Sequence, residues 1–209
     1  MSGFFMSVTN SAVQIACNSM LSRYGGDLYV GVMTVINSVR EIITMPVSGL
    51  TNGAQPVIGY NYGAKEYKRV KKAIRFTGIC CVAFTTVLWG VLYMWPQIFI
   101  HLFNSNPKLL EVGIPAFRIY FFGIFLLSLQ FIGQSTFVAL GKSKQAVFFS
   151  LLRKAIIVIP LIFWLPTIGG LGVNGVFLAE PISNLVGGVA CFSTMWFTVY
   201  RKLGKKKSK

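Results

Sequence analysis

Apolar residues are grouped along this chain into six long runs separated by short polar segments. Each run is long enough to cross the hydrocarbon core of a bilayer, about 30 Å, as a helix. The predicted spans are residues 4–21, 28–58, 76–103, 112–140, 146–166 and 176–200. The second is too long for one straight crossing, and Pro46 and Pro56 predict a kinked helix whose end protrudes beyond the lipid. The pattern predicts an all-α, polytopic membrane protein.

Charged residues are scarce, which supports the membrane assignment. Of the 209 residues, 54% are hydrophobic and 12% are charged, whereas about a quarter of the residues in a soluble protein are charged. The mean hydropathy of +0.64 points the same way. This composition excludes a disordered chain and disfavours a water-soluble globule.

The sequence lacks the residue patterns of enzymes and of metal sites. It contains no P-loop, no dinucleotide-binding fingerprint and no nucleophile elbow. The single histidine, His101, has no acidic partner at a motif spacing. All four cysteines lie in apolar runs without CxxC spacing, so we interpret them as small apolar packing residues. We therefore expect that the protein is not an enzyme and has no catalytic residue, cofactor or metal site.

Basic residues are distributed unevenly between the loops, and they give the chain a formal net charge of +15. They cluster in residues 65–75, 142–144 and 201–209. The alternate loops hold only Arg23 and Lys108. Because positively charged loops stay in the cytoplasm, we predict a multi-pass protein of the plasma (cell inner) membrane with both termini cytoplasmic. The charge reflects topology, and we expect no nucleic-acid partner because no recognition motif accompanies it.

The segment between the second and third runs has a helical spacing of its own. Within residues 64–75, charged positions are interleaved with Tyr67, Val70 and Ala73. This spacing suits a short helix on the cytoplasmic surface, and it equally suits a solvated connector. We predict a basic cytoplasmic loop over residues 60–75 and a basic cytoplasmic tail over residues 201–209.

Polar side chains form a stripe along each of the first two runs. Ser7, Ser11, Gln14 and Asn18 fall within about 60° of arc on a helix. The stripe of the second run spans about 80° and consists of Thr34, Asn37, Glu41, Thr44, Ser48, Asn52 and Gln55. In lipid, such faces must meet other helices or water. Two stripes on consecutive helices favour a water-filled cleft, with helix packing as the alternative.

Glu41 is the most informative single residue of these stripes. A charge at the centre of a membrane costs about 3 kcal/mol even on mild insertion scales, so such charges are rare and usually functional. One interpretation is a carboxylate that faces the cleft and attracts a cation or exchanges a proton. The other is an ion pair with Arg40, Arg118 or a basic residue of another helix.

The remaining charged and amide residues of the spans are assigned more modest roles. Glu180, near the outer end of the sixth run, is expected to reach interfacial water. Arg118, Arg153 and Lys154 are expected to extend along their helices to the membrane surface. On the fourth run, Gln134 shares a face with Gln130 and adds to the expected polar lining.

Three segments carry a resemblance to a known family. The first runs from Gly49 to Lys65 and has the sequence GLTNGAQPVIGYNYGAK. The second combines ALGK at residues 139–142, SLLR at residues 150–153 and IPL at residues 159–161. The third combines GVNGV at residues 172–176 with AEP at residues 179–181. In this order they resemble the multidrug and toxic compound extrusion (MATE) transporters of the MOP superfamily, in the DinF/MepA-like branch.

The resemblance implies a transporter of twelve helices, arranged as two six-helix lobes around a central cleft. Members export organic cations and other drugs in exchange for protons or sodium. The chain is similar to the C-terminal lobe alone, so we expect residues 1–209 to form one six-helix lobe. Its partners would be the bilayer, amphipathic drugs, and a second lobe that is either an N-terminal half or another copy. The chain would be a fragment, a truncated product or a half-size subunit. Alternative functions are a lipid-linked saccharide flippase of the same superfamily and a non-transporting subunit.

The resemblance also assigns residues to the cleft. In the MepA-like branch, an acidic residue of the eighth helix and a Met or Ala four places later line the cavity. Glu41 and Met45 match this pattern. Glu41 is accordingly the candidate for coupling to a cation. The expected lining of the cleft is Gln14, Asn18, Asn37, Glu41, Thr44, Met45 and Gln134. Members with a sodium site in this lobe carry acids on the seventh and tenth helices, where this chain has amides. Coupling to H⁺ or to Na⁺ therefore stays open.

Overall fold

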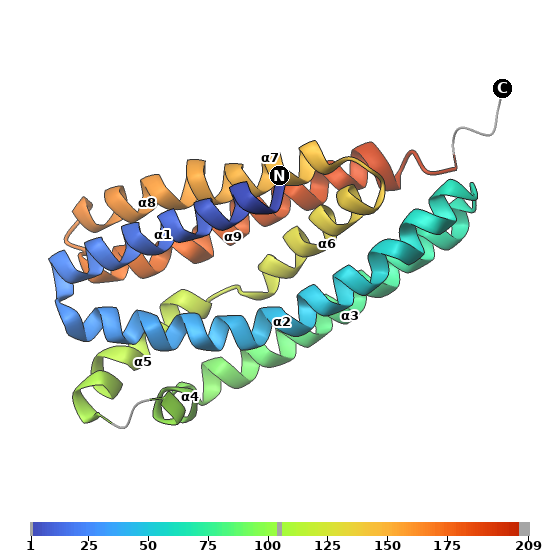
Figure 1. Ribbon diagram of the computed structural model, residues 1–209. Coiled ribbons are helices and arrows are strands. Elements are labelled where there is room, and N and C mark those ends of the chain that lie inside the picture. Colours follow the sequence, from blue (N-terminus) through green and yellow to red (C-terminus); the bar gives the residue numbers. More distant parts are fainter. Residues whose placement is uncertain (1, 104–105, 205–209) are drawn as a thin grey trace.

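Helices make up almost all of the computed structural model, which describes residues 2–103 and 106–204, with the backbone alone for residues 2–7. In chain order they are α1 (Ser2–Gly25), α2 (Asp27–Gly63), α3 (Tyr67–Met94), α4 (Pro96–Phe103), α5 (Pro107–Phe121), α6 (Phe125–Ala139), α7 (Ser143–Leu151), the π-helix η1 (Leu152–Val158), α8 (Ile159–Trp164), the 3-10 helix η2 (Leu165–Thr167), α9 (Val173–Met195) and the π-helix η3 (Trp196–Tyr200). The long helices lie side by side in a bundle, and α2 and α3 form an extended hairpin along one side of it (Figure 1). The predicted all-α class is confirmed.

The number of helices that are long and apolar enough to cross a membrane is close to the predicted number. Within the described residues, four helical stretches are long and apolar enough to span a membrane: Asp27–Gly63, Tyr67–Met94, Ser143–Thr167 and Val173–Tyr200. The bent pair α5 and α6 together makes a fifth. The helix α1 has 24 residues, but its polar residues leave it below the apolarity of the others. The first predicted span, residues 4–21, is thus the one that is not among these stretches.

The predicted basic loop over residues 60–75 is wrong in extent, because most of it is helical. The helix α2 continues to Gly63 and α3 starts at Tyr67. Val70 and Ile74 are buried in line with the apolar face that continues along α3. The amphipathic spacing therefore marks the first turns of a long helix, and not a separate surface helix or a solvated connector.

Two predicted spans are interrupted. The third ends at Met94, and residues 96–103 form the separate helix α4, which begins at Pro96. The fourth is broken between α5 and α6, whose axes differ by 44°. Gly123 lies in this break with a φ of 73°, a left-handed conformation that favours glycine. The predicted span over residues 112–140 is therefore a bent pair of helices.

The two internal prolines do not break α2. The helix has 37 residues, a length of about 55 Å at about 1.5 Å per residue, which exceeds the hydrocarbon core. Proline has no backbone N–H, so Pro46 and Pro56 each remove one hydrogen bond from the helix. Long helices tolerate such losses when neighbouring helices hold them in place, and α2 packs against α1, α3, α5 and α6.

Two apolar clusters form the core, one toward each end of the bundle. One contains Val39 and Ile43 of α2 together with Ala179 of α9. The other contains Val47 of α2 and Cys191 of α9. Between Ala179 and Cys191 the buried face of α9 turns polar, and this level of the bundle holds the site described below.

Glycines allow α6 and α9 to pack closely at the second cluster. A Cβ on Gly188 would lie 2.6 Å from the carbonyl oxygen of Leu126, and one on Gly133 would lie 2.7 Å from the Sγ of Cys191. The four cysteines are free, and three of them are buried. The packing role expected for cysteine thus applies directly to Cys191, which fills the space beside Gly133.

We predict that Gly188→Ala destabilises the protein by about 1–3 kcal/mol, the usual cost of overpacking, because α9 would have to move away from the α6 backbone. The matched control is Gly49→Ala, where a new Cβ meets nothing within 4 Å. That change should stabilise the helix by about 0.5–1 kcal/mol. Unfolding free energies in mixed detergent and SDS micelles check both values, and equal effects of the two substitutions would contradict the packing argument.

Candidate functional site

A polar cavity of about 130 Å³ opens between the first two helices and the later half of the bundle. Its lining comes from α1, α2, α5, η1, α8 and α9. The polar lining residues are Asn10, Gln14, Asn37, Arg40, Glu41, Tyr120, Lys154 and Glu180. The stripes predicted on the first two runs therefore face a common polar space over part of their length.

Three of the predicted cleft residues line this cavity: Gln14, Asn37 and Glu41. None of the three forms a hydrogen bond or an ion pair through its side chain with another described residue. The predicted ion pair of Glu41 with Arg40 or Arg118 is not formed. Arg40 pairs with a different carboxylate, and Arg118 is exposed over the ring of Tyr93, 5.6 Å from its centroid.

The other four predicted residues lie outside this lining. Asn18 is half-buried on α1. The Oγ1 of Thr44 donates a hydrogen bond to the backbone carbonyl of Glu41 at 3.3 Å. Met45 is 66% exposed on the outside of the lobe. The Nε2 of Gln134 is buried without a hydrogen-bond partner. These residues stay predictions for the wider cleft.

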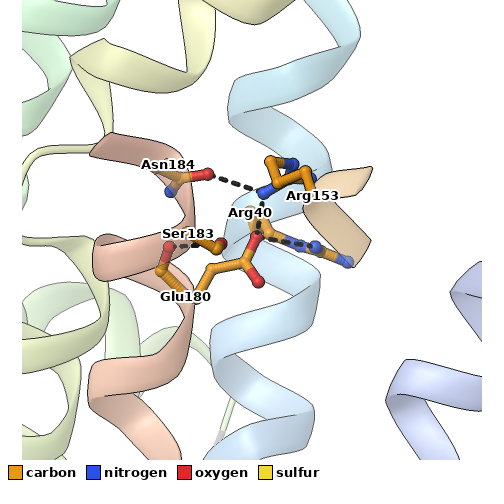
Figure 2. Close-up of polar contacts among 5 residues, drawn as sticks. All are labelled: Arg40, Arg153, Glu180, Ser183 and Asn184. Carbon is orange, nitrogen blue, oxygen red and sulfur yellow. Dashed lines mark hydrogen bonds and ion pairs between the residues drawn. The ribbon is translucent and has the colours of Figure 1, made fainter. Parts of the chain in front are cut away.

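An ionic network lies beside the cavity, and two of its members, Arg40 and Glu180, belong to the cavity lining. Figure 2 shows the contacts of this network. The Nη1 of Arg153 donates hydrogen bonds to Oε1 of Glu180 at 2.9 Å and to Oδ1 of Asn184 at 2.6 Å. The Nη1 of Arg40 lies 3.8 Å from the same Oε1 of Glu180. One carboxylate on α9 thus contacts guanidinium groups from two other helices, α2 and η1.

The sequence-based roles of Glu180 and Arg153 are wrong. Glu180 was expected to reach interfacial water, but it is 7% exposed, and Arg153 was expected to extend to the surface, but it is 4% exposed. Both remain inside because each neutralises the other, which removes the main cost of burying an isolated charge. Lys154 was expected to extend as well, but it is half-buried and lines the cavity.

Local backbone structure brings the network together. Arg153 lies in the π-helix η1, a helix type that is frequent at functional sites. Opposite it, Gly187 leaves room for the arginine stem, since a Cβ there would lie 2.7 Å from Cγ of Arg153. Glu180, Asn184 and Gly187 follow one another at helical spacing on one face of α9. That spacing was a signal in the sequence that could have identified the arginine-binding face.

The family of this chain follows from a comparison with protein-family models. The MatE model matches residues 4–164. The chain belongs to the MatE family. Members of this MatE family are transporters and not enzymes.

Individual relatives agree with the assignment. The chain is 28% identical over 170 residues to the FAD transporter of Shewanella oneidensis and 24% identical over 158 residues to the probable multidrug resistance protein NorM of Caulobacter vibrioides. These alignments cover 78% and 75% of this MatE chain. A multidrug resistance MATE family transporter of the MOP superfamily, solved in an outward-facing conformation, superposes with a TM-score of 0.85 at 18% identity over 96% of the chain.

The MatE chain is shorter than these relatives. It spans 35% and 33% of the length of the two curated relatives and 45% of the solved transporter. The fold match extends over nearly the whole chain, so residues 2–204 correspond to one contiguous part of a larger transporter fold. Because the chain covers less than half of each relative, the substrates of those proteins are not transferred to it.

We predict that Glu180→Gln destabilises the lobe by about 3 kcal/mol, because the change leaves Arg153 buried without a counter-charge. The double variant with Arg153→Gln should recover at least about 1 kcal/mol of this loss, since it removes the unpaired charge as well. Unfolding free energies in mixed micelles provide the measurement. Glu111→Gln, at an exposed position of α5, is the matched control, and equal stability of it and Glu180→Gln would show that the network does not hold the lobe.

Proposed function

We propose that this chain is one lobe of a multidrug efflux antiporter, which exports organic cations and other xenobiotics across the plasma membrane in exchange for protons or sodium. Within the family we place it in the DinF/MepA-like branch, as the C-terminal lobe. The single observation that carries the proposal is the polar cavity on α1 and α2, with the carboxylate of Glu41 in its lining and no ion pair to occupy that carboxylate.

Glu41 supports the proposal through its charge and its accessibility. Its side chain is exposed at the edge of the cavity, whereas the other carboxylate of the lining, Glu180, is already paired with two arginines. An unpaired carboxylate in a membrane-embedded cleft attracts a cationic substrate or a coupling ion. The amide side chains of Gln14 and Asn37 add hydrogen-bonding groups to the same lining.

Transport would follow an alternating-access cycle with a second lobe. Two repeats that rock against one another expose a site between them to each side of the membrane in turn. The polar faces of α1 and α2 are the surface that this lobe would contribute to the cleft. The second lobe is an N-terminal half or a second copy of the chain, and either one would shield these faces from lipid.

The coupling ion is proposed to bind in part outside this lobe. Within residues 2–103 and 106–204 no group of three or more His, Cys, Asp or Glu side chains could hold a metal ion. The guanidinium groups around Glu180 also oppose sodium binding there. Glu41 remains the candidate of this lobe for proton exchange or for contact with a cationic substrate.

The basic ends of the helices support a topology with both termini in the cytoplasm. The first turns of α3 carry Lys68, Arg69, Lys71 and Lys72, and the turn before α7 carries Lys142. These groups lie at the same end of the bundle, because the short α2–α3 and α6–α7 connections are both there (Figure 1). We assign this end to the cytoplasm.

A second candidate function is the flipping of a lipid-linked saccharide. It is favoured by Arg40 and Lys154 in the cavity lining, since basic groups bind the phosphates of such lipids. A non-transporting subunit is the third possibility. Lipid flipping in reconstituted vesicles without drug export would favour the second candidate, and the absence of both activities would favour the third.

We predict that Glu41→Gln reduces the export of a fluorescent organic cation such as ethidium at least about ten-fold, the effect of losing one charge-assisted contact. The initial efflux rate from dye-loaded cells that express the complete gene product is the measurement. Repeating it in vesicles with an imposed pH gradient or sodium gradient identifies the coupling ion.

Glu111→Gln is the matched control, because it removes an exposed carboxylate from α5 and should leave efflux unchanged. Export by Glu41→Gln at the wild-type rate would remove Glu41 from the cation pathway.

A further inference from the structure

The cavity carries a second charged feature that cation export does not explain. Lys154 lines it, and this ammonium group forms no hydrogen bond or ion pair with the described residues. The charged groups that act on it are Arg153, Glu180 and Arg40, two cations and one carboxylate. The carboxylate is already bound to Arg153 at 2.9 Å and lies 3.8 Å from Arg40. Lys154 thus has no counter-charge of its own.

Counting every charged group of the wall gives an excess of positive charge. The cations are Arg40, Arg153 and Lys154, and the carboxylates are Glu41 and Glu180. Glu41 is coupled electrostatically to Arg40, on the same helix. In a space lined by membrane helices an uncompensated cation is costly, and an anion from outside the chain would stabilise this arrangement.

We propose that this cavity binds a negatively charged group, a carboxylate or a phosphate, with Lys154 as its direct ionic partner and Arg40 beside it. The proposal deepens the proposed function, on which it rests, by naming a substrate class: amphipathic molecules that carry an anionic group. Because Glu41 lines the same cavity, such a molecule can carry a cationic group as well.

The size and the lining of the cavity fit such a group. Its volume of about 130 Å³ corresponds to about four water molecules at about 30 Å³ each, which is enough for a carboxylate or phosphate head. The side-chain amides of Asn10, Gln14 and Asn37 also lack hydrogen-bond partners among the described residues and provide N–H donors. The aliphatic side chains of Val13, Met33 and Ile162 complete the wall.

The position of Lys154 is held by its neighbours. It follows Arg153 in η1, and Arg153 is fixed by hydrogen bonds to Glu180 and Asn184. The two side chains leave a helix about 90–100° apart, which lets one bind α9 while the other faces the cavity. The ionic network thereby keeps the ammonium group at the cavity wall.

The test compares two probes that share one fluorophore and differ in charge. Dansylglycine carries a carboxylate, and dansylcadaverine carries an ammonium group. Binding of each to the purified full chain in phosphatidylcholine nanodiscs is followed by fluorescence anisotropy, with empty nanodiscs as background. We expect Lys154→Met to weaken dansylglycine binding at least about ten-fold, the loss of one charge-assisted hydrogen bond, while dansylcadaverine binding is unchanged or tighter.

Two variants separate this role from an effect on folding. Lys154→Arg keeps the charge and should retain most of the affinity for dansylglycine. Lys144→Met removes an exposed lysine of α7 and should change neither probe. Unchanged dansylglycine binding by Lys154→Met would overturn the proposal, as would equal weakening of both probes.

The outcomes also distinguish this proposal from the proposed function. Wild-type binding of dansylcadaverine without dansylglycine would overturn the anion site and leave cation export standing. Failure to bind either probe would overturn both. If phosphatidylglycerol in the nanodiscs weakens dansylglycine binding to the wild type and not to Lys154→Met, the anion site is confirmed and a lipid headgroup is its source.

Discussion

The carboxylate of Glu180 is the group on which the inner arrangement of this lobe depends. It lies on α9 at the level where the two apolar clusters meet, and it contacts guanidinium groups from η1 and α2. A buried charge is tolerated only with a partner in good geometry, so the position of this one carboxylate constrains three helices at once. The π-helical turn of η1 and the missing side chain of Gly187 are the local adjustments that bring Arg153 within 2.9 Å of it.

The ionic network lies between a closely packed region, formed by α6 and α9, and the polar cavity beside α1 and α2. Around the network, α6 and α9 approach so closely that Gly133 and Gly188 have no room for a Cβ. Around the cavity, the side chains of Asn10, Gln14, Asn37 and Glu41 on α1 and α2 lack partners among the described residues. Close packing is thus concentrated at α6 and α9, while polar groups without partners are concentrated at the cavity beside α1 and α2.

The helices and the polar front could be predicted from the sequence, because both follow from local periodicity. Gln14, Asn37 and Glu41 were placed on one polar side by angular spacing alone, and the structure brings them to a common cavity. The ionic network could not be predicted with the same tools, because Arg153 and Glu180 are 27 residues apart and their contact depends on how two antiparallel helices align. The break at Gly123 and the early start of α3 at Tyr67 were missed for a related reason. Hydropathy measures how apolar a segment is, but helix continuity depends on backbone conformation and on the packing of an amphipathic face.

The distribution of charge along the cavity follows from the same network. Glu180 is shared between Arg153 and Arg40, whereas Lys154 on η1 forms no ion pair of its own with the described residues, so η1 gives the cavity a positive group. Glu41, on α2, gives the opposite side a negative group. A cavity with separate positive and negative groups orients a bound molecule, because an amphipathic ligand with both charges fits in a single direction and one with a single charge is drawn to one group. Substrate selection in this lobe would therefore depend on where the ligand carries its charges as much as on its net charge.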